Sequence, residues 1–316
     1  MSKKRRRSRP RGQAEGRAAS TAVEPERPSR TPAGPFPRGT FDTPFPPIRT
    51  ALARGFVTVG ASTGLLAAAF AVELVRWVGL VILGFEGPPG PTLLTSIALP
   101  PINTAFDLFN AQSIFGAQLA SSIALLAFFS IDSVVLALFA AIVVQRLEGN
   151  EGVGDALRRG ARAIPIVLTA QVIAVSGLLL GNQILPILGG GLAFLGQFAI
   201  LLGLIFFLAN VPIAAVRLRV GIQETIRRAG RAGILPGSRH LLLCVLYFFV
   251  TYMMLPVVFL AAPEGARFGV NPSVGVWVIA LVASFIHLGF LAAFAYRWIA
   301  AEDDIPTEPV RIRRPR

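Results

Sequence analysis

The chain has 316 residues, of which 53% are hydrophobic and only 15% are charged. It is too apolar for an ordinary soluble domain and too long for a single membrane anchor. The formal net charge of +13 would suit a nucleic-acid partner, but the positive residues lie in the two tails and in short loops between apolar stretches. We therefore expect a multi-pass membrane protein without a nucleic-acid partner, whose basic residues set its orientation.

Residues 1–47 are rich in Arg, Pro, Ser and Gly and contain almost no apolar run. Such a segment buries too little surface to offset chain entropy, so we predict a disordered, basic cytoplasmic tail. Its Lys3–Arg7 block resembles the charged region of a signal peptide, but no apolar stretch follows before about Phe56, so we expect the tail to be retained. The tail has two possible roles: it binds anionic headgroups, or it stays solvated and holds the N-terminus inside.

A membrane domain at 48–300 follows, with six apolar stretches long enough to cross a bilayer. We predict spans at about 55–83, 114–144, 164–188, 192–216, 240–262 and 273–299. Arginines gather in the loops between the second and third and between the fourth and fifth spans, whereas the loop at 86–113 has no Lys or Arg. The positive-inside bias therefore predicts a cell-membrane protein with both termini in the cytoplasm, including the tail at 301–316.

The intramembrane polar candidates are Asp132, Glu73, Arg76 and His287. Asp132 lies mid-span, where a carboxylate costs about 2.5–3.5 kcal/mol on insertion scales, so it should face the interior and be protonated or paired. Asp132 is either a protonated side chain hydrogen-bonded to a neighbouring helix as a packing contact, or part of a proton- or cation-linked function. Glu73 and Arg76 are neighbours on one helix face, and Trp77 beside them favours a headgroup-level position over a functional pair.

A short basic motif precedes three of the spans. It reads Gly-Asp-Ala-Leu-Arg-Arg-Gly-Ala-Arg-Ala at 154–163 and Gln-Glu-Thr-Ile-Arg-Arg-Ala-Gly-Arg-Ala at 223–232, with a weaker copy at 50–55. On a helix its arginines separate from its apolar residues, the pattern of a short helix lying in the headgroup layer. Since each copy heads a pair of spans, we predict three quasi-repeated helical hairpins with basic interfacial helices on the cytoplasmic side. The candidate lipid-headgroup residues are Arg158, Arg159, Arg162, Arg227, Arg228 and Arg231.

This motif resembles one found in six-span bacterial and archaeal proteins similar to the membrane domain attached to some glycerophosphoryl diester phosphodiesterases. In that group an acidic-Ala-Leu-Arg/Lys-Arg helix precedes the hairpins, as Asp155–Arg159 does here. The resemblance covers about residues 48–300 and implies a six-span helical fold, mostly without an assigned activity. Neither tail has room for the phosphodiesterase domain, so the enzymatic name is not carried over.

The sequence contains no recognisable catalytic, cofactor or metal motif. Lysine occurs only at positions 3 and 4, which excludes a phosphate-binding loop of the Gly-rich Lys-Ser/Thr type. One cysteine and two histidines provide neither a Cys-based nor a His-rich metal site, and His287 is interpreted as a packed residue. We expect a non-enzymatic protein that acts through lipid contact or membrane organisation, with anionic lipids as partners.

The alternative is a small-solute or ion-coupled transporter that uses Asp132. Pro256 and the Asn210–Pro212 run favour it, because transport sites often use interrupted helices, and we expect the latter run to bend or break the fourth span. Convergence of Asp132, Gln171, Gln197 and His287 on one cavity would support this alternative. A membrane-embedded enzyme ranks third, since no group of residues supports it.

Overall fold

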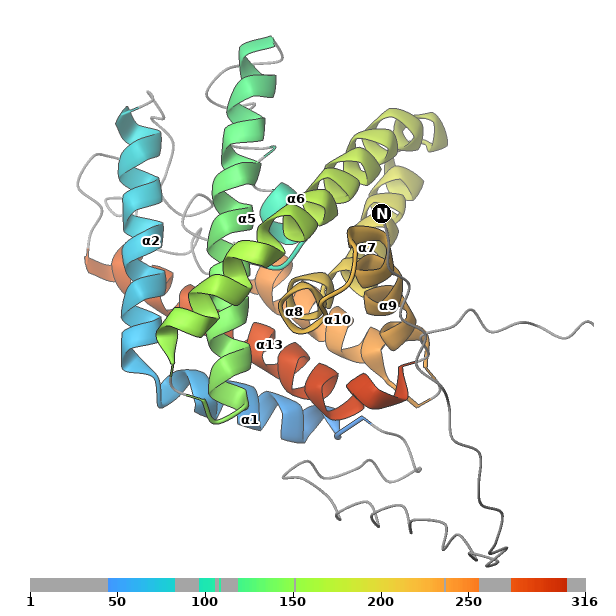
Figure 1. The fold of residues 1–316 in the computed structure, drawn as a ribbon. Coiled ribbons are helices and arrows are strands. Elements are labelled where there is room, and N and C mark those ends of the chain that lie inside the picture. The colour runs from blue at the N-terminus through green and yellow to red at the C-terminus, as the bar shows by residue number, and fades with distance from the viewer. Residues whose placement is uncertain are drawn as a thin grey trace, which may run out of the picture. The chain divides into compact units, whose positions relative to one another are not determined.

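The computed structural model describes residues 45–82, 97–105, 108, 119–150, 152–235, 237–255 and 274–305. The chain divides into Met1–Pro35 and Phe36–Arg316, and the described residues all belong to the second unit. Within these ranges every regular element is a helix (Figure 1), so the predicted all-α class is confirmed. The predictions for the tail up to residue 44, the greater part of the outer loop at 86–113, the segment 256–273 and the tail from 306 lie outside the described residues.

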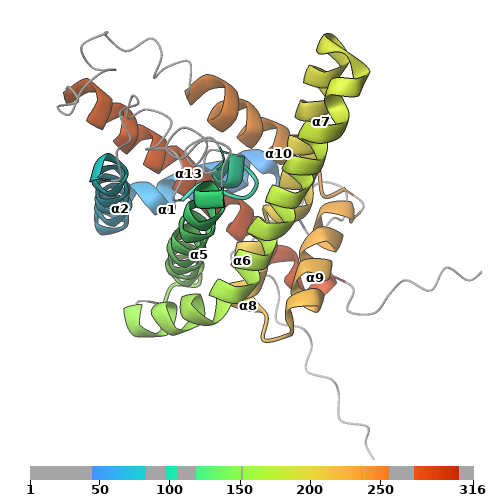
Figure 2. The same ribbon diagram turned by 90° about the horizontal axis from the view of Figure 1, so that it is seen from above.

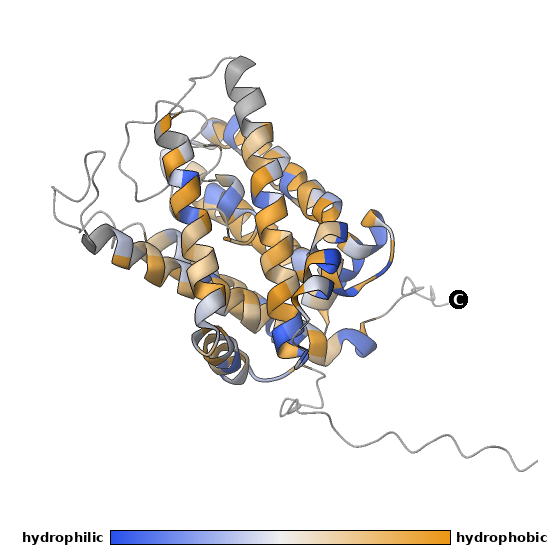
Figure 3. Cartoon of the chain, turned by 60° about the vertical axis from the view of Figure 1, so that its left-hand side comes forward, coloured by the Kyte–Doolittle hydropathy of each residue, from blue (hydrophilic) through white to orange (hydrophobic). Residues whose placement is uncertain are grey.

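Four stretches of the described chain are long and apolar enough to cross a membrane. They are Leu126–Leu147 in α5 (Leu119–Leu147), Val153–Ile187 in α6 (Val153–Ile184) and η1 (Leu185–Leu188), Gly190–Arg217 in α7 (Gly190–Leu208) and α8 (Val211–Arg217), and Ala280–Asp304 in α13 (Val274–Ala301) and η3 (Glu302–Asp304). A bent pair, α1 (Ile48–Gly60) and α2 (Thr63–Ile82), can supply a fifth. Figure 3 shows hydrophobic residues along much of these helices, so the chain is a helical protein with four or five candidate spans.

The first predicted span, at 55–83, is two helices instead of one. The axes of α1 and α2 differ by 81° across the break at Ala61 and Ser62. α1 packs along α13, and α2, which runs in another direction (Figure 1), contacts α13 through Phe70 and Trp77, whose rings lie against Trp277. Gly55 permits this packing, because a Cβ there would lie only 2.5 Å from the carbonyl oxygen of Gly289. The bend takes up the length by which the predicted span exceeded a bilayer.

The basic motif at 154–163 is not the separate short helix that we predicted. It forms the first turns of α6, which continues through Pro165 without a break. A Cβ on Gly160 would lie 3.0 Å from the Leu138 Cα of α5, so the two backbones are in close contact. α6 continues although the proline removes one of its backbone hydrogen bonds. Three small motif residues are buried: Ala156, Gly160 and Ala163.

The second copy of the motif does form a helix of its own, α9 (Ile222–Ile234). It packs against α7 and α8 with Thr225, Ala229 and Ala232 buried. The break predicted at Asn210–Pro212 is confirmed, since α7 ends at Leu208 and α8 begins at Val211. Figure 2 shows α9 beside the end of α8 and away from α2.

The shorter apolar helix α10 (His240–Phe248) continues into the π-helical η2 (Phe249–Met254) and is the described part of the predicted fifth span. Near the end of α13, the buried Arg297 donates from Nη2 to the Ser238 carbonyl and from Nε to the Pro46 carbonyl at 3.3 Å. Its guanidinium also lies 5.1 Å from the ring centre of Phe45. Arg297 therefore connects the segment before α1 and the segment before α10 to α13.

Candidate functional site

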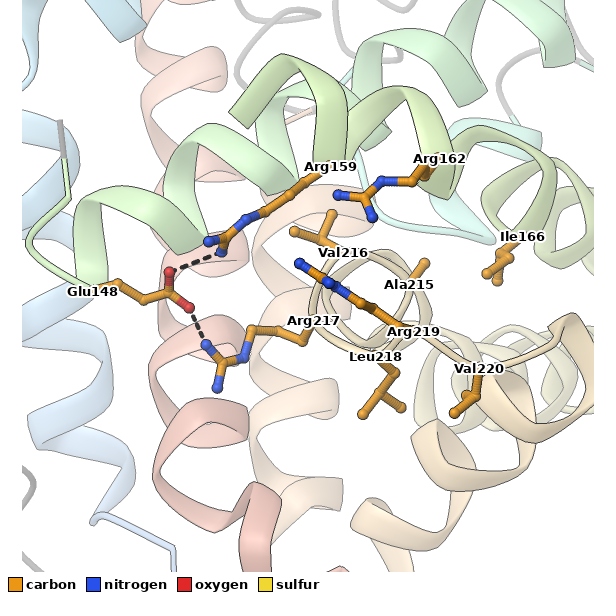
Figure 4. Close-up of a pocket in the computed structure, with 10 residues that line it drawn as sticks. All are labelled: Glu148, Arg159, Arg162, Ile166, Ala215, Val216, Arg217, Leu218, Arg219 and Val220. Atoms are coloured by element: carbon orange, nitrogen blue, oxygen red, sulfur yellow. Dashed lines mark hydrogen bonds and ion pairs between the residues drawn. The ribbon is translucent and has the colours of Figure 1, made fainter. Parts of the chain in front are cut away.

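A cavity of about 570 Å³ lies where the end of α5, the first half of α6 and the end of α8 meet (Figure 4). Arginine side chains enter it from two helices and from the segment after α8. We call it the arginine cavity. Its lining residues are Glu148, Arg159, Arg162, Ile166, Ala215, Val216, Arg217, Leu218, Arg219 and Val220.

Glu148 reaches the cavity because α5 ends in a Schellman turn. The N–H of Asn150 bonds to the Gln145 carbonyl at 3.1 Å, and the N–H of Gly149 bonds to the Arg146 carbonyl at 3.1 Å. Gly149 has φ 75°, a conformation that a residue without a side chain adopts at low cost. The turn leaves Glu148 at the helix terminus, where it faces the start of α6.

The α6 wall of the cavity follows from helical periodicity. Arg159, Arg162 and Ile166 are spaced three and four residues apart, so they share one face of α6. Arg158, one turn before Arg162, does not line the cavity. Ile166 is buried, whereas Arg162 is exposed, so the arginine side chain extends from an apolar base toward solvent.

The opposite wall is the end of α8 and the segment that leaves it. Arg217 is the last residue of α8, where a cation interacts favourably with the helix dipole. Leu218 is extended, with ψ 138°, and the chain stays non-helical to Gly221 before α9 begins. Arg219 and Val220 are therefore presented on an exposed connecting segment rather than packed on a helix.

Two of the four arginines are neutralised by carboxylates. Arg159 Nη1 donates to Glu148 Oε2 at 2.9 Å, and Arg217 Nη1 pairs with Glu148 Oε1. Arg217 Nε also donates to Glu302 Oε2 at 2.7 Å, which links the cavity to the end of α13. These two arginines and two glutamates form a chain of ion pairs with no net charge.

The other two arginines keep their positive charge. In the part of the chain that the structure describes, Arg162 and Arg219 form no ion pair. Arg162 Nε donates only to the carbonyl of Arg158, one turn earlier, at 3.3 Å. In Figure 4 the dashed contacts run from Arg159 and Arg217 to Glu148, and none runs from Arg162 or Arg219.

This combination suits an anion with an apolar attachment. A guanidinium offers several donors in a planar fork that matches phosphate and carboxylate oxygens. Ile166, Val216, Leu218 and Val220 supply apolar surface next to those donors. The described residues contain no group of three or more His, Cys, Asp or Glu side chains that could hold a metal ion.

The structure brings together two of the six arginines predicted to bind headgroups, Arg159 and Arg162. Arg227 and Arg228 bond to Glu224 on their own helix, at 2.7 and 2.8 Å from Nε. The hydrogen bond from Arg228, followed by the bond and charge of Arg227, lowers the pKa of the Glu224 carboxyl below its ordinary value. That carboxylate therefore already satisfies part of the donor capacity of both arginines.

The remaining predicted arginines lie outside the cavity as well. Arg158 is exposed and lies 3.9 Å from Asp155, a loose surface ion pair, and Arg231 is half-buried on α9. Sequence reasoning missed Glu148, Arg217 and Arg219 as site residues. The two arginines were visible as loop charges, but no local pattern shows that they fold back on the start of α6.

The intramembrane candidates lie elsewhere. Asp132 pairs with Arg76 across α2 and α5, and both side chains are buried. The Arg76 guanidinium also lies 5.6 Å from the ring centre of Phe128. Glu73 is fully buried one turn before Arg76. Asp132 and Arg76 thus form a contact between α2 and α5, and the headgroup-level position of Glu73 and Arg76 stays a prediction.

Gln171 and His287 make separate contacts. Ser133 Oγ donates to Gln171 Oε1 at 3.1 Å, and the Tyr247 hydroxyl lies 3.3 Å from His287 Nδ1. The same hydroxyl accepts the N–H of Leu99 at 2.7 Å, which ties the segment at 97–105 to α10. The arginine cavity is lined by none of Asp132, Gln171, Gln197 and His287.

Comparison with protein-family models, with curated proteins and with solved structures finds no match for the chain. The resemblance to the phosphodiesterase-associated membrane proteins therefore stays an expectation from the motif at 155–163 and 224–232.

Proposed function

We propose that the protein is a non-enzymatic, multi-pass membrane protein that binds anionic lipid headgroups in the arginine cavity. The observation that carries this proposal is the presence of two arginines without a carboxylate partner among the described residues, Arg162 and Arg219, beside an apolar wall. A phosphate would bond to the guanidinium groups, and the glycerol and upper acyl carbons would contact Val216, Leu218 and Val220.

The test is a pair of double variants with equal loss of charge. Arg162→Gln/Arg219→Gln removes the two uncompensated cavity cations, and Arg146→Gln/Arg158→Gln removes two exposed cations that do not line the cavity. At about 1 kcal/mol per basic residue near a membrane surface, the cavity variant should bind anionic lipid roughly tenfold to thirtyfold more weakly. Native mass spectrometry of detergent-purified protein with added phosphatidylglycerol measures the effect.

The control variant should bind lipid nearly as well as the parent, and raising the ionic strength should narrow the difference between parent and cavity variant. Equal losses in the two variants would mean that the arginines act only as diffuse surface charge. No loss in either variant would remove the support for a headgroup site.

We also propose six spans arranged as three quasi-repeated hairpins, with both termini and the arginine cavity in the cytoplasm of a cell-membrane protein. Support comes from burial, since the small residues at matched motif positions are buried in all three copies. These are Ala51, Ala156 and Thr225 at one position and Gly55, Gly160 and Ala229 at the other. Each copy packs on the last span of a neighbouring hairpin: α1 on α13, the start of α6 on α5, and α9 on α7 and α8.

Single-cysteine labelling tests this topology in a Cys244→Ala background. A cysteine at Arg158 or Arg219 should react with a membrane-impermeant reagent only after permeabilisation, because the positive-inside bias places both on the inner side. A cysteine at Gly90, in the loop without Lys or Arg, should react in intact cells. The reverse pattern would overturn the orientation.

A transporter that uses Asp132 is the alternative. An ionisable residue in a span favours a functional role, and Asp132 is buried. Its pairing with Arg76 and the separate contacts of Gln171 and His287 support a packing role instead. We therefore rank transport second and membrane-embedded catalysis third.

A further inference from the structure

We propose that the arginine cavity prefers a phosphomonoester dianion, such as the headgroup of a phosphatidate-type lipid, over a phosphodiester monoanion. This inference rests on the proposed function and adds the chemical class of the ligand. Its basis is the charge that remains uncompensated at the site.

The charge balance of the cavity leaves two positive charges. Arg159 and Arg217 are matched by Glu148 and Glu302 in a chain of ion pairs. Arg162 and Arg219, on opposite walls, have no carboxylate partner among the residues that the structure describes. A ligand that restores neutrality without disturbing the existing pairs therefore carries about two negative charges.

Charge and the number of terminal oxygens distinguish the two ligands. Glu148 also lines the cavity, but its carboxylate is already paired with Arg159 and Arg217. A phosphodiester brings one negative charge and leaves one of the two remaining positive charges uncompensated. A phosphomonoester carries about 1.5–2 negative charges at pH 7, because its second pKa is near 6, and has three terminal oxygens for the two guanidinium groups.

The preference for a dianion should depend on pH in a defined direction. Below about pH 6 the phosphomonoester holds its second proton and resembles a diester in charge. The arginines stay charged throughout this range. The cavity should therefore favour the monoester at pH 7.5 and lose most of that preference at pH 5.5.

The experiment compares dioleoyl phosphatidate with dioleoyl phosphatidylglycerol by native mass spectrometry of the full-length protein at both pH values. We expect the parent to bind phosphatidate about fivefold or more tightly at pH 7.5, and to bind the two lipids nearly equally at pH 5.5. Arg162→Gln/Arg219→Gln should lose the preference, and Arg146→Gln/Arg158→Gln should keep it. The pH comparison on the parent needs no variant, so it stands even if a variant fails to fold.

A soluble arm identifies the source of the phosphate. If glycerol 3-phosphate displaces phosphatidate at similar concentrations, the cavity binds a free phosphomonoester. If displacement needs a large excess of glycerol 3-phosphate, the cavity binds the lipid. Either result supports the dianion preference. Equal binding of both lipids at pH 7.5, with a loss in the cavity variant, would overturn the preference and leave the headgroup site standing. Binding of either lipid that the cavity variant does not reduce would overturn both.

Discussion

Replacing Asp132 by Leu should lower the free energy of unfolding by about 3–5 kcal/mol. The substitution leaves the Arg76 guanidinium, whose side chain is 5% exposed, without the carboxylate that it bonds to across the α2–α5 contact. A buried charge that loses a bonded carboxylate costs far more than a broken surface pair, because water cannot replace that partner. Reversible unfolding of the protein in mixed micelles, monitored by circular dichroism, measures the change.

The double variant Arg76→Leu/Asp132→Leu tests whether the loss of stability in Asp132→Leu comes from breaking the ion pair. Replacing both partners of a buried ion pair by apolar residues is often neutral, but Glu73 is also buried one turn before Arg76, so we expect the double variant to regain only part of the lost stability. Two additive losses would contradict the ion-pair account.

Proton or solute flux in vesicles tests the transporter alternative on the same variants. Flux by the parent that a well-folded double variant lacks would favour transport.

Adding a single methyl group at Gly55 should also be strongly destabilising. The Cβ of Gly55→Ala would lie 2.5 Å from the Gly289 oxygen and 2.7 Å from the Ala293 nitrogen, and both are backbone atoms of α13. Backbone atoms cannot rotate away, so α1 and α13 must separate, at a cost of about 3 kcal/mol or more. The measurement is the unfolding free energy together with the yield of monodisperse protein.

Gly203→Ala is the matched control. Gly203 lies inside α7, and a Cβ there would meet no atom within 4 Å. Because alanine is a better helix former than glycine, this change should be neutral or stabilising by up to about 1 kcal/mol. Similar losses at Gly55 and Gly203 would show that the α1–α13 contact is not the cause.

Composition and periodicity predicted the helical class and most of the long helices, because apolar length alone is decisive for a membrane span. They did not predict the 81° bend between α1 and α2 or the continuity of α6 through Pro165. Nor did they predict the close contacts between helices at Gly55 with α13 and at Gly160 with α5. A local sequence pattern shows that a residue is small, but it does not show which backbone packs against that residue.

The candidate site was predictable to the same limited extent. The arginines of the motif were visible, and helical spacing grouped Arg158, Arg159 and Arg162, of which Arg159 and Arg162 line the cavity and Arg158 does not. The spacing of three and four residues allowed Glu224 to pair with Arg227 and Arg228, but the sequence could not show that Arg162 forms no ion pair with a described residue. It also could not place Arg219, which reaches the cavity only because the chain after α8 is extended.

The central claim is that an anionic headgroup occupies the arginine cavity, and photo-crosslinking tests it most directly. A phosphatidate with a diazirine close to its glycerol would be irradiated with the full-length protein, and the labelled residues would be located by peptide mass spectrometry. We predict labelling concentrated at residues 159–166 and 215–220, and loss of that labelling in Arg162→Gln/Arg219→Gln. Labelling spread equally over α1, α9 and the cavity, and unchanged in the variant, would contradict the claim.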